Sequence, residues 1–118
     1  MLRNTQVVYR KIDQSDSVDA YIEKKVTKLQ RLVEEIILCR VVLEAPHQHH
    51  NKGKSYHVTI ELVLPNLSIV VSNDHHDKGD HEDLYIALRD AFTAINKQVI
   101  TKVKRKPSRE RHYESLVA

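Results

Sequence analysis

The chain has 118 residues, 41% of them hydrophobic, and 19 Lys and Arg against 16 Asp and Glu give it a formal net charge of +3. This length suits one domain with a single core. No window approaches the roughly 20 consecutive apolar residues of a membrane span, so we expect a soluble, cytoplasmic protein.

The first third of the chain predicts a strand followed by a helix. Residues Gln6–Ile12 are rich in β-branched and aromatic side chains, which favours a strand. From Ser17 onward apolar residues recur every three or four positions, which is typical of an amphipathic helix. Ser15, Asp16 or Ser17 can cap its N-terminus. The expected apolar stripe consists of Val18, Ile22, Val26, Leu29 and Val33.

Three further strands are expected in the middle of the chain. Residues Tyr56–Leu64 alternate between apolar and polar side chains, which indicates a strand with one buried face. Pro65 and Asn66 then predict a tight turn, so Leu67–Ser72 should return beside that strand as a hairpin. The earlier run Ile36–Glu44 has the length of a strand, and its predicted core face holds Ile37, Cys39, Val41 and Leu43.

A second amphipathic helix is expected after a loop from Asn73 to His81. Its apolar residues recur at steps of three and four, and Pro107 should stop it. We therefore expect a single domain over residues 1–106 and a short flexible tail over 107–118. The expected stripe consists of Tyr85, Leu88, Phe92, Ile95 and Val99.

These elements predict an α+β fold in the order β-α-β-β-β-α. A crossover helix joins parallel strands, whereas short turns join antiparallel ones. The simplest arrangement is one four-stranded mixed sheet with both helices packed on one face. Both helix N-termini should then lie at one end of the molecule, and the basic C-terminal halves of both helices at the other.

The motifs of several enzyme classes are absent from the sequence. With only Gly53 and Gly79 there is no GxGxxG and no GxxxxGK[ST], and GxSxG, HExxH and CxxC do not occur either. The single cysteine, Cys39, lies inside an apolar run and predicts a buried hydrophobic residue rather than a nucleophile. We therefore expect no enzymatic activity, no cofactor and no small-molecule substrate.

Two histidine-rich stretches raise the alternative of a metal-binding module. APHQHHNKGKSYH begins at Ala45 and DHHDKGDHED begins at Asp74, and the predicted topology places both at the same end of the sheet. No cysteine lies nearby and the spacing is irregular, so a solvated polar loop is the simpler interpretation. The candidate ligands of the alternative are His47, His49, His50, His75 and His76.

Basic residues along both predicted helices form the candidate functional surface. They are spaced to follow a phosphate backbone, which favours nucleic-acid binding. Because we expect few exposed aromatic residues, folded RNA recognised by its shape and phosphates is a better ligand than single strands recognised by sequence. A generic double-stranded-RNA-binding domain is a second alternative. The candidate RNA-binding residues are Lys24, Lys25, Lys28, Arg31, Arg89, Lys97, Lys102, Lys104, Arg105 and Lys106.

Three blocks of the sequence resemble the ribosome hibernation-promoting factor family, also called ribosome-associated translation inhibitors. They are YIEKKVTKLQRL from Tyr21, CRVVLEAPHQHHNKGKSYHVTIELVLP from Cys39 and HEDLYIALRDAFTAINKQV from His81. The most specific pieces are KVTKLQR in the first helix, which fits the family pattern KxxKLxR, and HEDLYIAL opening the second. The blocks follow one another in the family's order and span nearly the whole chain.

The resemblance implies a bacterial stress or stationary-phase protein of the short form. Such a protein would bind the small ribosomal subunit, meaning 16S rRNA and neighbouring ribosomal proteins, and block translation by occupying the channel for messenger and transfer RNA. It would be monomeric when free. The resemblance assigns family basic positions to Lys25, Lys28, Arg31 and Lys97, whereas Ala94 and Thr101 stand where relatives often carry a basic residue.

Overall fold

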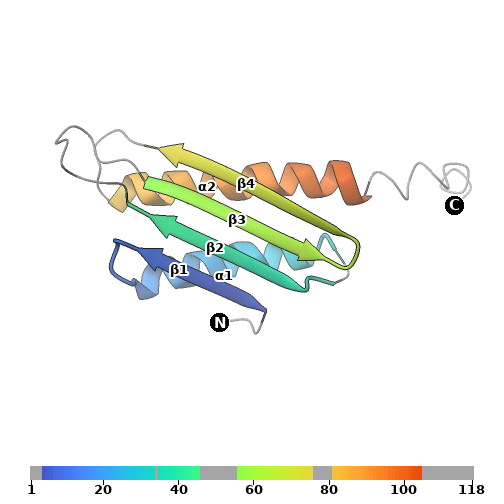
Figure 1. Cartoon of the computed structure of the whole chain (residues 1–118), viewed down its shortest axis with the longest axis horizontal. Coiled ribbons are helices and arrows are strands. Elements are labelled where there is room, and N and C mark those ends of the chain that lie inside the picture. The colour runs from blue at the N-terminus through green and yellow to red at the C-terminus, as the bar shows by residue number, and fades with distance from the viewer. Residues whose placement is uncertain (1–3, 34, 46–55, 76–80, 105–118) are drawn as a thin grey trace, which may run out of the picture.

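The computed structural model describes residues 4–33, 35–45, 56–75 and 81–104. Its elements follow the predicted order (Figure 1). A π-helix is added after the last α-helix. They are β1 (Thr5–Arg10), α1 (Asp16–Gln30), β2 (Leu38–Glu44), β3 (Tyr56–Leu64), β4 (Leu67–His75), α2 (His81–Val99) and η1 (Ile100–Lys104).

The four strands form one sheet in the spatial order β1-β2-β3-β4. β1 and β2 are parallel, with α1 as the crossover between them, and β2, β3 and β4 are successively antiparallel. Both helices lie on the same face of the sheet and run in the same direction, with α1 behind β1 and β2 and α2 behind β3 and β4 (Figure 1). The predicted α+β architecture is confirmed, and it leaves the other face of the sheet open.

The start of α1 is fixed by local hydrogen bonds. Ser15 is the N-cap, and its hydroxyl oxygen accepts a hydrogen bond from the backbone N–H of Val18 at 3.3 Å. The Tyr9 hydroxyl on β1 donates to Asp19 Oδ1 at 2.7 Å and lies 3.1 Å from the Ser15 carbonyl oxygen. These contacts attach the first turn of α1 to the edge strand beneath it.

The core fills the space between the sheet and the helices. From α1 it takes Val18, Ile22, Val26 and Leu29, all fully buried, as the helical spacing predicted. Cys39 is also fully buried, and burial raises the pKa of its thiol to about 12. A thiol in that state stays protonated near neutral pH, which agrees with a structural role.

Three details of the fold differ from the sequence-based prediction. Ile37 was expected on the core face of β2 but lies at a bend before the strand and is 50% exposed, while Ile36 takes the buried place. β4 continues to His75, so the expected loop is shorter. The α-helical pattern ends at Val99 and becomes the π-helix η1, which rotates the following side chains relative to a continuous α-helix.

Candidate nucleic-acid interface

The predicted RNA-binding residues that the structure describes lie on the layer of helices. Six of them are exposed, namely Lys24, Lys28, Arg31, Arg89, Lys97 and Lys102, and Lys25 is half-buried. Lys104 ends η1, although its side chain lies outside the described part of the structure, as do Arg105 and Lys106.

The basic residues of α1 follow directly from its helical periodicity. The buried stripe Val18, Ile22, Val26 and Leu29 faces the sheet. Tyr21, Lys25 and Lys28 are separated by four and three residues, so they lie along one flank beside that stripe. Lys24 and Arg31 are seven residues apart and share the solvent side of the helix. The result is a basic flank with one aromatic ring in it.

The flank of α1 meets α2 through a pair of tyrosines. The ring centroids of Tyr21 and Tyr85 are 5.2 Å apart with an interplanar angle of 85°, the edge-to-face geometry that aromatic pairs prefer. The Lys25 Nζ atom lies 5.4 Å from the centroid of the Tyr21 ring, within range of a cation–π interaction. We call Tyr21, Lys25, Tyr85 and Arg89 the interhelical seam.

Positive charges from both helices act on Lys25. Burial lowers the pKa of its ammonium group, and the neighbouring cations Lys28, Lys24 and Arg89 lower that pKa further. Arg89 belongs to α2, so the fold brings charge from two helices to one place. A positive potential of this kind attracts anions, and phosphate groups most strongly.

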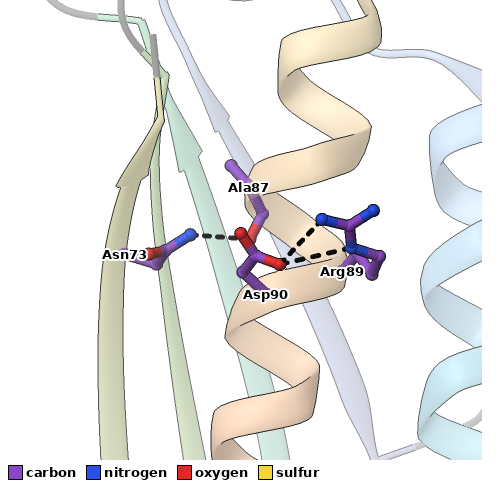
Figure 2. A network of polar contacts seen from close by, with 4 residues as sticks. All are labelled: Asn73, Ala87, Arg89 and Asp90. Atoms are coloured by element: carbon purple, nitrogen blue, oxygen red, sulfur yellow. Dashed lines mark hydrogen bonds and ion pairs between the residues drawn. The ribbon is translucent and has the colours of Figure 1, made fainter.

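Arg89 extends from the side of α2 that faces α1 (Figure 2). Its Nε and Nη2 atoms donate to Asp90 Oδ1 at 3.2 and 3.1 Å, and both side chains are well exposed. On the opposite side of the helix, Asn73 Nδ2 of β4 donates to the Ala87 carbonyl oxygen at 3.1 Å. That bond ties α2 to β4, so Arg89 projects from a helix that is fixed to the sheet.

Not every predicted residue joins the seam. Lys97 is exposed on α2 but lies eight residues after Arg89, which rotates it by roughly 80° around the helix axis. Ala94 is half-buried and Thr101 is exposed. The described basic surface is therefore densest beside α1, and along α2 its cations are more widely separated.

The position of the two tyrosines among the cations was not predicted from the sequence. Few exposed aromatic residues were expected, and Tyr85 was assigned to the apolar stripe of the second helix. In the structure both rings are half-buried and lie among cations. The available signal was spacing, because Tyr21 precedes Lys25 by four residues and Tyr85 precedes Arg89 by four, the distance at which helical neighbours touch.

Most of the histidines predicted as alternative metal ligands lie outside the described residues. His47, His49, His50 and His76 lie outside the described residues, and so does the side chain of His75. Within the described ranges there is no group of three or more His, Cys, Asp or Glu side chains that could hold a metal ion. In the same part of the chain, no helix is long and apolar enough to cross a membrane.

Comparison with known proteins gives consistent results. Residues 5–107 match the family described as Sigma 54 modulation protein / S30EA ribosomal protein. The crystal structure of the Thermus thermophilus Protein Y N-terminal domain is similar, with a TM-score of 0.60 and 25% identity over 80% of this chain and 91% of that one.

A ribosomal subunit interface protein from Coxiella burnetii shares the fold, with a TM-score of 0.56 and 17% identity over 80% of this chain and 94% of that one. No curated protein sequence matches significantly. Since the family match spans residues 5–107, the chain belongs to the Sigma 54 modulation protein / S30EA ribosomal protein family, the ribosome hibernation family that its helices resemble.

Proposed function

We propose that this protein is a hibernation factor that binds the small ribosomal subunit through the basic faces of α1 and α2. It occupies the channel for messenger and transfer RNA and so blocks translation under stress or in stationary phase. It acts in the cytoplasm by occupancy, without catalysis. Family membership supports the ribosome as the partner, and the charges around Lys25 support the helices as the contact surface.

The observation that carries this proposal is the convergence of like charges on Lys25. Burial lowers the pKa of its ammonium group most, and Lys28, Lys24 and Arg89 lower it further, so the fold holds these cations close together against their mutual repulsion. A phosphate backbone relieves that repulsion and releases condensed counterions. The same four residues are spaced along two neighbouring helices, which suits the backbone of folded 16S rRNA.

Electrostatic docking of this kind predicts a strong dependence on salt. Each phosphate contact adds roughly 0.7 to 0.9 to the slope of log affinity against log salt. If about six cations engage, the affinity should fall by roughly a thousandfold between 50 and 200 mM salt. The free protein should be monomeric, because repulsion between two copies of the basic surface opposes their association.

The decisive test replaces Lys25, Lys28 and Arg31 together by Glu. We expect this variant to lose co-sedimentation with purified small subunits in a sucrose gradient, because it removes three cations from α1 and adds repulsion toward phosphate. The matched control replaces Arg10 and Lys11, at the end of β1, and Arg40, on β2, by Glu. Both variants lower the formal charge by six, so they separate local contacts from net charge.

Retained co-sedimentation of the α1 variant would contradict the proposed surface. Equal loss in both variants would instead indicate an effect of net charge alone. A second measurement addresses the channel, with transfer RNA binding to small subunits programmed with messenger RNA. The wild-type protein should exclude transfer RNA, and simultaneous binding of both would contradict occupancy of that channel.

A further inference from the structure

Tyr9, Tyr21 and Tyr85 have different surroundings. The Tyr9 hydroxyl is used inside the fold, where it contacts Asp19 and Ser15. Tyr21 and Tyr85 instead meet each other through their rings. Among the described residues, the hydroxyl groups of these two tyrosines have no hydrogen-bond partner. Their polar ends are therefore available to a ligand or to solvent.

Cations surround this aromatic pair. Lys25 lies over the Tyr21 ring, and Arg89 acts electrostatically on both Tyr21 and Lys25. Two helices that only needed to pack together could meet through aliphatic side chains, which make up most of this core. Half-buried rings beside cations instead combine the two features that proteins use for unpaired nucleotides, a surface for the base and charge for the phosphate.

We propose that the interhelical seam binds a single unpaired nucleotide of folded RNA. Its phosphate lies between Lys25 and Arg89, and its base contacts the rings of Tyr21 and Tyr85. This inference rests on the proposed function and sharpens it. The other exposed lysines and arginines of the helices would contact any phosphate backbone, whereas the seam would select RNA in which one nucleotide is turned out of its helix.

The geometry also gives Lys25 two alternative positions. In the free protein its ammonium group lies over the Tyr21 ring, close to three other cations. A bound phosphate offers that group a stronger, charge-assisted interaction than the ring does. When Lys25 turns to the phosphate, it uncovers the face of Tyr21 for the base. Phosphate and base binding are therefore coupled through one side chain.

The test compares Tyr21→Leu and Tyr85→Leu with the wild-type protein in binding to purified small subunits. Loss of a stacked base should weaken binding by roughly 5-fold to 150-fold in each variant. Tyr21→Phe keeps the ring and should stay within about threefold of wild type. Tyr56→Leu, a half-buried tyrosine on β3 outside the seam, is the matched control for loss of packing.

Photocrosslinking gives a readout that packing alone would not change. The protein is made with Tyr21→p-azidophenylalanine, which keeps an aromatic ring, and with the same residue at Val70, which is 57% exposed on the open face of the sheet. Irradiation of the complexes should attach position 21 to unpaired nucleotides of 16S rRNA, mapped by primer extension. Position 70 should give no such crosslink.

The possible results separate this inference from the proposed function. If the wild-type protein does not bind small subunits, the proposed function fails. If the wild-type protein binds and both leucine variants bind as tightly as it does, the nucleotide site is wrong while the hibernation function stands. The same conclusion follows if position 21 crosslinks only to paired nucleotides or to protein. If the leucine variants unfold, thermal melting reveals it, and the crosslink decides alone.

Discussion

The open face of the sheet and the outer face of the helices carry similar residues in different arrangements. On the sheet, Arg10 lies opposite Glu44 and Arg40 lies opposite Glu61 in the strand register. Residues directly opposite on neighbouring strands share a face, so each arginine has an acid within reach. On the sheet face each of these two arginines is therefore placed opposite an acid.

The helix face instead places like charges beside one another. Lys24, Lys25 and Lys28 lie along α1 and Arg89 approaches them from α2, with like charges acting on one another. Like charges at helical contact distance cost stability, so this arrangement is unfavourable for the isolated protein. The distribution of charge therefore distinguishes the two faces better than the net charge of +3 does.

The largest effect should come from reversing two charges on the helix face, and the same change on the sheet face is its control. Lys24→Glu with Lys28→Glu removes two phosphate contacts worth roughly 1.5 to 3 kcal/mol each, so affinity for small subunits should fall by about 100-fold or more. The salt slope should fall by about 2. Arg10→Glu with Arg40→Glu carries the same formal charge and should leave both quantities close to wild type. Equal effects of the two pairs would remove the distinction between the faces.

A smaller effect, on stability rather than binding, is expected from changing Tyr9, whose hydroxyl group is hydrogen-bonded within the fold. Tyr9→Phe removes a hydrogen bond to the Asp19 carboxylate and should lower the free energy of unfolding by about 1 to 2 kcal/mol. Binding to small subunits should be unchanged, in contrast to the leucine variants of the seam. Denaturant unfolding and co-sedimentation measure the two quantities, and a binding defect without loss of stability would reverse the assignment.

The contribution of Tyr9 to stability should also depend on pH. Burial and the hydrogen bond to Asp19 raise the pKa of Tyr9 above its ordinary value of about 10. Above that pH the unfolded chain loses the proton while the folded chain keeps it, so the contribution of Tyr9 to stability is complete below about pH 10 and declines above it. Tyr9→Phe should therefore make the loss of stability at high pH less steep.

The sequence was sufficient to predict the fold because its periodicities are strong. The stripe from Val18 to Leu29 and the alternation of Tyr56–Leu64 each bury one face, and these two patterns leave few ways to arrange the elements. Ile37 was misplaced because a bend precedes β2, and an apolar run does not reveal where its extended conformation begins.

The candidate site was predictable in part. Helical spacing indicated the basic flank of α1, because that pattern lies within one element. The seam depends on the distance between two helices, which no periodicity within either helix gives. Tyr85 in particular belongs to an apolar stripe by its spacing, and only the position of α1 beside it makes the residue part of a mixed aromatic and basic cluster.

The smallest effect concerns Asp90, an acid paired with Arg89 beside this basic cluster. Asp90 accepts two hydrogen bonds from Arg89, and both side chains are well exposed. Such a pair contributes little to stability, but its carboxylate opposes an incoming phosphate. Asp90→Asn should therefore tighten binding to small subunits by roughly twofold to fivefold. Glu61→Gln removes one negative charge from the open sheet face and is the matched control. Both variants raise the formal charge by one. Tighter binding in Asp90→Asn alone would place the phosphate beside Arg89. An equal gain in both variants would show that only net charge matters.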